Sequence, residues 1–326
     1  MPKLDLELLY LRGENARIGL QDLSHHLKRT PQRLKYTFSV MEKEGILRDP
    51  YCVFDYSYFG LILFRVYFKG GYISEQDKTG IISTLKENPY VISVYELTGE
   101  FDLCVEFASP NPSRFNKELK KISNFAPTLT DYKIVLNVVT HLYPRQYLTN
   151  NSSFQILHGD RIVGGDRIQE EFKEQELQVI KTLRQYPVAP FTTLAKKSDL
   201  NVRTVNSILK NLTERNVIKG YKYVLDTSVA GISTTRVFLK LHNFSPEREA
   251  QLKIYLLTTL GIVQSHKTVG DWDMELDIEA LDKSKIRSII IDMREKFKDL
   301  IEKFNLIEVY KCYKKSYLPA YLFKDS

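Results

Sequence analysis

Residues 55–60 read Asp-Tyr-Ser-Tyr-Phe-Gly, and residues 226–231 read Asp-Thr-Ser-Val-Ala-Gly. The chain therefore repeats itself at an offset of 171 positions, as from 55 to 226. The same offset relates Gly-Glu-Phe-Asp at 99–102 to Gly-Asp-Trp-Asp at 270–273. A register that is kept without a gap over about forty residues indicates two copies of one structural unit. The fold of the chain is then the fold of one such unit, present twice.

Length and composition agree with a globular protein that has more than one domain. The chain has 326 residues, of which 43% are hydrophobic and 27% charged, and its mean hydropathy is −0.28. No apolar run approaches the roughly 20 residues of a membrane span, and Met1 is not followed by a basic and apolar leader. We therefore expect a cytoplasmic protein with no membrane partner.

Cysteine spacing and net charge narrow the class of partner. Cys52, Cys104 and Cys312 lie far apart, with no C-x-x-C pair, which argues against a disulfide framework and a zinc site. We expect no cofactor and no metal. The net charge of +7 and the isoelectric point near 9.0 favour an anionic partner.

Each copy opens with three predicted helices, and the third has the clearest start. Thr30 can cap this helix, and Pro31 takes the first helical position, where its missing N–H costs nothing. The apolar face recurs in the second copy while the exposed face varies. Its positions are Leu34, Phe38 and Met41 in the first copy, and Val205, Leu209 and Leu212 in the second. Gly45 or Asn216 can end the helix in a left-handed conformation before a strand, which predicts a winged helix.

Basic residues outnumber acidic ones around both third helices, which favours double-stranded DNA as the partner. In a helix-turn-helix the exposed side of this helix meets base edges, and Arg, Gln and Asn can bind bases bidentately. The predicted DNA-binding residues are Gln32, Arg33, Lys35 and Tyr36 in the first copy, and Arg203, Thr204, Asn206 and Lys210 in the second. A solvated helix face is the alternative for each residue, and a packing or dimerisation module is the alternative for each domain.

After each winged helix the pattern changes to β-α-β-β-α-β, over residues 61–139 and 235–313. This order is typical of a ferredoxin-like sheet with two helices on one face, so the predicted fold class is α+β. The other face must be covered, and we expect the two copies to pair as an intramolecular pseudo-dimer. Edge strands left open in the two sheets would also allow a homodimer of whole chains.

These patterns divide the chain into five segments. The predicted boundaries are 1–54 for the first winged helix, 55–141 for the first ferredoxin-like domain, 142–174 for a linker, 175–225 for the second winged helix and 226–326 for the second ferredoxin-like domain. Gly159-Asp160 predicts a small hairpin within the linker. Such a linker would hold the two winged helices at a set separation, and a plain surface excursion is the alternative.

The order of these motifs resembles the Lrp/AsnC, or feast/famine, family of transcriptional regulators. The features shared are Asn-Ala-Arg at 15–17, the Asp-x-x-x-x-Gly exit from each winged helix and the Gly-x-x-Asp between the middle strands. The resemblance covers nearly the whole chain, once per half. It implies a sequence-specific regulator whose second domain mediates assembly and senses a small molecule, often an amino acid. Most members carry one copy, so the tandem form leaves the family's octameric assembly and ligand site in doubt here.

The resemblance implies effector binding near the Gly-x-x-Asp turns, at Gly99, Asp102, Gly270 and Asp273. A glycine can supply the positive φ that such a turn needs, and the aspartate can accept hydrogen bonds from a ligand ammonium group. The structural alternative is a hairpin whose aspartate binds the backbone of the turn itself.

Two other function classes stay open. Siroheme decarboxylases resemble these regulators in fold, but the six histidines show no cluster beyond the adjacent His25 and His26, and nothing builds a catalytic centre. We therefore expect no enzyme activity. An architectural DNA-binding protein is the third class, and the differing exposed faces of the two recognition helices argue against it.

Overall fold

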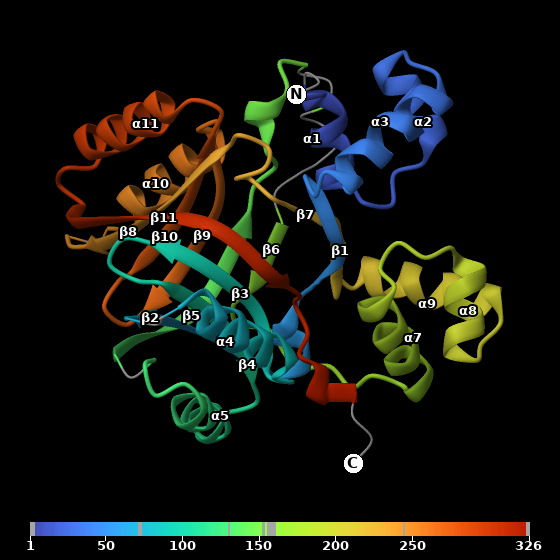
Figure 1. Ribbon diagram of the computed structural model, residues 1–326, viewed down its shortest axis with the longest axis horizontal. Coiled ribbons are helices and arrows are strands. Elements are labelled where there is room, and N and C mark those ends of the chain that lie inside the picture. The colour runs from blue at the N-terminus through green and yellow to red at the C-terminus, as the bar shows by residue number, and fades with distance from the viewer. Residues whose placement is uncertain are drawn as a thin grey trace.

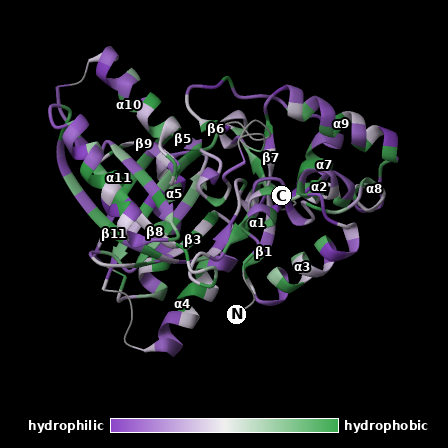
Figure 2. Cartoon of the chain, turned by 90° about the horizontal axis from the view of Figure 1, so that it is seen from above, coloured by the Kyte–Doolittle hydropathy of each residue, from purple (hydrophilic) through white to green (hydrophobic). Residues whose placement is uncertain are grey.

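The computed structural model describes residues 4–70, 74–129, 131–151, 154, 161–243 and 245–323. Two winged helices lie on one side of a β-barrel, and further helices pack on the outside of the barrel (Figure 1). Hydrophobic and hydrophilic residues alternate along several barrel strands and outer helices (Figure 2). Within the described ranges, no helix has both the length and the apolar character needed to cross a membrane.

The two winged helices are built alike. The first contains α1 (Leu6–Glu14), α2 (Leu20–Leu27), α3 (Pro31–Lys43) and β1 (Leu47–Phe54), and the second contains α7 (Glu174–Gln185), α8 (Phe191–Ser198), α9 (Val202–Glu214) and β7 (Ile218–Leu225). Gly45 has a φ of 75° and Asn216 a φ of 63°, so both third helices end in the left-handed conformation that the sequence predicts.

Each ferredoxin-like unit supplies four strands and two helices, which confirms the predicted α+β class. The first has β2 (Ile62–Lys69), α4 (Glu75–Glu87), β3 (Val91–Thr98), β4 (Leu103–Ser109), α5 (Pro112–Phe125) and β5 (Asp131–Leu142). The second has β8 (Ser233–Leu241), α10 (Pro246–Thr258), β9 (Ile262–Val269), β10 (Met274–Ala280), α11 (Lys283–Lys296) and β11 (Ile301–Lys315). Three short 3₁₀ helices are η1 (Tyr56–Phe59), η2 (Gln146–Leu148) and η3 (Ala320–Phe323).

The two sheets join edge to edge and close into a barrel. The strand order is β2-β4-β3-β11-β8-β10-β9-β5, and β5 also pairs with β2. The junctions between the copies are β3 with β11 and β5 with β9, both antiparallel. The expectation of open sheet edges is therefore wrong: those backbone groups pair with the other copy, because a closed barrel has no edges to protect.

The linker joins this sheet instead of standing apart from it. Strand β6 (Arg161–Gly164) pairs antiparallel with β5 at Val139–Leu142 and extends the sheet beyond the barrel. The predicted hairpin turn at Gly159-Asp160 lies outside the described residues.

Strands β1 and β7 pair with each other and connect the two winged helices. The backbone N–H of Asp55 donates to the carbonyl of Val217, and the N–H of Asp226 donates to Ile46, both at 2.9 Å. These two bonds are related by the repeat offset. Each strand also enters the core of the other unit: Val53 and Phe54 of β1 are buried with the α7–α9 core, and Tyr223 and Leu225 of β7 with the α1–α3 core. The two winged helices are therefore interlocked.

Substitution of Gly164 tests how closely β6 packs against Tyr56 and Val138. Its φ is +87°, and an added Cβ would lie 2.5 Å from the Tyr56 hydroxyl and 3.0 Å from the Val138 carbonyl. Tyr56 cannot easily move, because it is buried and accepts a hydrogen bond from Asn137 at 2.9 Å. We predict that Gly164→Ala lowers the free energy of unfolding by the roughly 1–2 kcal/mol of a left-handed alanine plus about 1–3 kcal/mol for the clash.

The matched control is Gly231→Ala. Gly231 has a similar φ of +69° but nothing within 4 Å of an added Cβ, so only the conformational cost applies. Urea denaturation of both variants measures the difference, and equal destabilisation would contradict this description of β6.

Candidate nucleic-acid interface

The first recognition helix, α3, exposes the residues that the sequence assigns to DNA. Thr30 caps it by accepting the backbone N–H of Arg33 at 3.4 Å, and Pro31 stands in its first turn. Leu34 and Met41 are buried beneath it. The predicted contact residues Gln32, Arg33, Lys35 and Tyr36 are all exposed. Tyr36 is 73% exposed, an unusual degree for a large aromatic side chain with no partner protein.

The second recognition helix, α9, repeats this geometry with different side chains. Asn201 caps it by accepting the N–H of Thr204 at 2.8 Å. Arg203, Asn206 and Lys210 are exposed, whereas Thr204 is half-buried. Lys210 forms a surface ion pair with Glu214 at 3.8 Å, one turn further along. The structure thus places all eight predicted residues on two helices, four on each.

The two winged helices also touch each other directly through Arg17. Its guanidinium donates to the carbonyls of Pro187 (2.7 Å) and Ala189 (3.1 Å) in the loop between α7 and α8, and it lies 4.6 Å from the ring centroid of Tyr221. Position 188, which corresponds to Arg17 at the repeat offset, is a valine. This contact has no counterpart from the second copy, so the pair of recognition helices is not strictly symmetric.

Glu14, at the end of α1, connects the winged helices to the barrel. It is fully buried and lies 2.8 Å from Lys222 of β7, 3.4 Å from Arg161 of β6 and 3.5 Å from Arg145. Arg145 also binds Glu279 of β10 at 2.7 Å. Elements from both winged helices and from the barrel therefore share one buried carboxylate.

The charges around Glu14 shift two pKa values. Burial alone would raise the pKa of Glu14, but Lys222, Arg145 and Arg161 outweigh burial and lower it to about 2. Burial lowers the pKa of Lys222 to about 8, and the two arginines add to this shift while Glu14 opposes it. Both shifts follow from one carboxylate that faces three cations.

The predicted effector residues lie in two turns at the far end of the barrel. Gly99 and Gly270 have φ of 130° and 148°, as the turns require. Asp102 accepts the backbone N–H of Gly70 at 2.6 Å, and Asp273 accepts that of Leu241 at 2.8 Å. Both carboxylates thus bind the backbone at the end of a neighbouring strand.

Lys133 bridges these two turns. Its ammonium group lies 3.2 Å from Asp271 and 3.6 Å from Glu100, and about 5.7–5.8 Å from the ring centroids of Trp272 and Phe101. The structure does bring the two turns together, with a cation of the chain itself between them.

The interior of the barrel holds a charged network that the sequence analysis did not identify. Arg65 pairs with Glu106 (2.8 Å) and Glu275 (3.0 Å), and Arg236 pairs bidentately with Asp277 (2.7 and 2.8 Å). The two arginines correspond at the repeat offset, and both are completely buried. Their recurrence at the repeat offset, each followed by a valine and an aromatic residue, is the signal in the sequence that could have revealed the network.

Tyr67 links the two halves of this network, and His266 lies at one side. The Tyr67 hydroxyl accepts from both arginines, at 3.1 and 3.2 Å, and donates to Glu275 at 2.5 Å. Burial and the nearby Arg65 lower the pKa of His266 well below its ordinary value, so the ring is neutral at pH 7. With its Nδ1 proton toward Asn137 (2.8 Å), its Nε2 can accept from Arg65 (2.5 Å).

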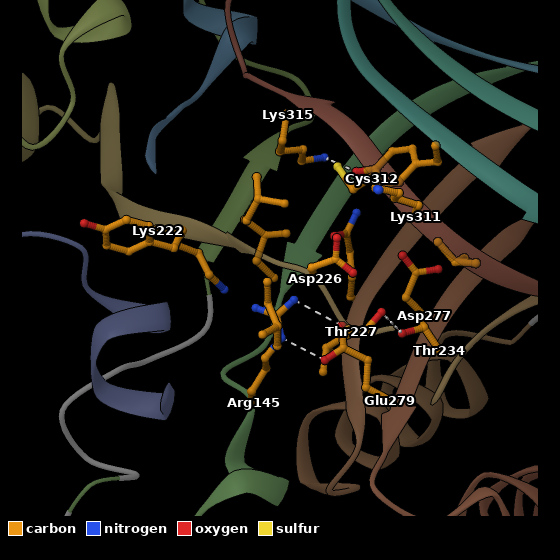
Figure 3. Close-up of a pocket in the computed structure, with 18 of the residues that line it drawn as sticks. Arg145, Lys222, Asp226, Thr227, Thr234, Asp277, Glu279, Lys311, Cys312 and Lys315 are labelled. Carbon is orange, nitrogen blue, oxygen red and sulfur yellow. Dashed lines mark hydrogen bonds and ion pairs between the residues drawn. The ribbon is translucent and has the colours of Figure 1, made fainter. Parts of the chain in front are cut away.

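A small cavity opens at the barrel end that faces the winged helices, and we call this end the barrel mouth (Figure 3). Its volume is about 90 Å³. It is lined by Lys222, Asp226 and Thr227 in or directly after β7, by Arg145, and by barrel residues that include Asp277 and Lys311. No cluster of His, Cys, Asp and Glu suited to a metal ion occurs in the part of the chain that the structure describes.

Sequence comparison identifies regulators as relatives of this chain. It is 27% identical over 124 residues to an uncharacterised HTH-type transcriptional regulator of Pyrococcus horikoshii, covering 38% of this chain and 78% of that protein. It is 26% identical over 123 residues to the HTH-type transcriptional regulator LysM of Sulfurisphaera tokodaii, covering 37% and 84%. Its sequence relatives are helix-turn-helix transcriptional regulators. No model of a known protein family matches the chain.

Solved structures match in two ways. A siroheme decarboxylase, NirDL, in complex with an iron-uroporphyrin III analogue, matches 96% of this chain and 93% of its own, with a TM-score of 0.57 and 16% identity. An AsnC family regulator from Agrobacterium tumefaciens matches 47% of this chain and 99% of its own, with a TM-score of 0.41 and 18% identity. The predicted resemblance to Lrp/AsnC regulators is confirmed, and the whole-chain match shows the tandem fold in a second protein.

The Glu14 cluster can be tested by substitution. We predict that Glu14→Gln destabilises the chain by about 3–5 kcal/mol, because Lys222, Arg161 and Arg145 lose a buried counter-charge. Urea denaturation at pH 7 measures this, with exposed Glu44→Gln on the first winged helix as the control.

The stability difference between wild type and Glu14→Gln should depend on pH. The folded-state pKa of Glu14 lies below its ordinary 4.5, so its stabilisation is complete above that value and is lost as pH falls toward about 2. The difference in free energy of unfolding between wild type and Glu14→Gln should therefore shrink between pH 4.5 and 2. A difference that stays constant over this range would contradict the assignment.

Proposed function

We propose that this chain is a sequence-specific DNA-binding transcriptional regulator of the Lrp/AsnC type, in which one chain supplies both winged helices. The observation that carries the proposal is the pair of capped recognition helices, each with an exposed polar face, held together by the interlocked β1 and β7. The regulators among its sequence relatives support it. Such a protein would act in the cytoplasm, on chromosomal DNA.

The proposed DNA contacts divide by chemistry. Arg33 and Arg203 occupy the first turns of α3 and α9, where recognition helices approach base edges, and each can bind guanine bidentately. Gln32 and Asn206 would contact adenine, and the lysines would contact phosphates. Since the two exposed faces differ, we expect two unlike half-sites rather than a perfect palindrome.

We predict that Arg33→Ala and Arg203→Ala each weaken binding to a selected operator by about tenfold to a hundredfold, which corresponds to the roughly 1–3 kcal/mol of a base contact. Selection from genomic DNA followed by titration at fixed salt measures this effect. Arg287→Ala is the matched control, because Arg287 is an exposed arginine on α11, away from both winged helices (Figure 1). If the chain selects no motif, or if the two arginine variants bind as tightly as Arg287→Ala, Arg33 and Arg203 do not contact bases as proposed.

A siroheme-decarboxylase-like activity is the competing proposal, and the whole-chain fold match favours it. Two features of the barrel argue against it. The cavity at the barrel mouth, about 90 Å³, is far below the roughly 300–1,000 Å³ of typical ligand sites, so a tetrapyrrole does not suit the barrel mouth. His266, the histidine inside the barrel, is neutral and engaged by Asn137, Thr140 and Arg65.

Visible absorbance separates the two proposals. We predict that adding an iron-uroporphyrin III analogue to the purified chain leaves its spectrum equal to the sum of the two components. A shifted absorbance band with saturable binding would instead favour the decarboxylase.

A further inference from the structure

The strands at the barrel mouth are irregular where they border one cavity. Pairing of β11 with β3 skips one residue between Val309 and Lys311, and another between Cys312 and Lys314. Lys311 and Cys312 lie between these two bulges, pair in consecutive register with Glu96 and Tyr95, and both line the cavity. A third bulge lies in β9 at Val263, and both Val263 and Gln264 line the cavity. Bulges that redirect side chains often mark functional sites.

One of the charged side chains that line this cavity, a lysine, has no opposite charge close to it within the described ranges. Most charged side chains that line it have an opposite charge within reach. The pairs are Arg145 with Glu279, Lys222 with Glu14, Asp226 with Arg48, Asp277 with Arg236, and Lys315 with Glu106. Lys311 has no carboxylate partner among the residues that the structure describes. Its ammonium group lies 5.4 Å from the centroid of the Tyr313 ring. Among the charged residues that line the cavity, Lys311 is therefore the one without an opposite charge in the part of the chain that the structure describes.

Polar groups other than charges complete the lining. The hydroxyl of Thr234 donates to that of Thr227 at 3.1 Å, and both threonines border the cavity, as does the amide of Gln264. Figure 3 shows Lys311 and Lys315 on one side of the cavity and Arg145 with Thr227 on the other. These groups can supply hydrogen bonds to a small planar oxyanion.

The cavity volume limits the size of the ligand. The cavity volume is about 90 Å³, which suits a ligand of a few heavy atoms. A molecule of the size of acetate suits this space. The charge and the volume together specify a small carboxylate.

The position of the cavity connects such a ligand to the winged helices. Asp226 and Thr227, which line the cavity, directly follow β7. Arg145 forms ion pairs with Glu279 of the barrel and with Glu14 of α1. A ligand that binds here touches the elements that hold the recognition helices in place. It can therefore bind their arrangements with unequal affinity, which is the requirement for allosteric coupling.

We propose that the barrel mouth is an effector site for a small carboxylate monoanion of about the size of acetate, with Lys311 as its charge partner. The coupling to DNA rests on the proposed regulator function, whereas binding of the carboxylate does not. This site is separate from the Gly-x-x-Asp turns, which close the other end of the barrel with Lys133 between them.

Isothermal titration of the full chain with sodium acetate, against sodium chloride at equal ionic strength, tests the site. A ligand with so few atoms should bind with a Kd of roughly millimolar or somewhat tighter. Lys311→Gln should weaken binding at least tenfold. Lys303→Gln is the matched control, because Lys303 lies on the same strand, is 69% exposed and pairs with Glu302 outside the cavity. Thr234→Val, which keeps the side-chain shape, should weaken binding without removing a charge.

Absence of acetate binding to the wild type, or equal binding by Lys311→Gln, would overturn the proposal. A second titration, with selected operator DNA, reads the coupling: acetate should change the DNA affinity of wild type and Lys303→Gln but not of Lys311→Gln. Acetate binding in a chain that selects no DNA would support the site and count only against the regulator function. DNA binding that acetate leaves unchanged would overturn the coupling.

Discussion

The exchange of β1 and β7 between the two winged helices is the constraint on which the remaining structure depends. Each strand pairs with the other and is buried in the core of the opposite unit, so neither helical unit has a complete core without its neighbour. The equivalent hydrogen bonds of Asp55 and Asp226 fix the two points at which the chain leaves the β1–β7 pair and continues toward the barrel. One chain thereby achieves the fixed spacing of two recognition helices that other regulators obtain by dimerisation.

The barrel carries the same pseudo-symmetry, but its interior is polar where an apolar core would be simpler. Burying Arg65 and Arg236 is unfavourable unless each charge is paired, and the three carboxylates and Tyr67 provide that pairing. Such a network favours one register of the two sheets, since a shift by one residue would bury the same charges without partners. The turns with Phe101 and Trp272 lie at one end of the barrel and the charged mouth at the other, toward the winged helices, so the two ends of the barrel differ.

Local patterns in the sequence were sufficient to predict the units, because helix caps, left-handed turn residues and strand alternation are properties of neighbouring residues. Thr30, Asn201, Gly45 and the Gly-x-x-Asp turns all adopt the conformations that their residue types favour. The strand exchange, the barrel closure and the Glu14 cluster were not predicted, because they join residues far apart in the sequence. Bulges such as those in β11 also escape a period-of-two pattern.

One chain presents two recognition helices as a fixed and unlike pair. Hydroxyl-radical footprinting on operator DNA selected by the wild type, at saturating protein, tests it most directly. A fixed and unlike pair should give two protected segments for the wild type, and loss of only one of them in Arg203→Ala. Protection of a single segment by the wild type, or loss of both segments together in the variant at saturation, would contradict it.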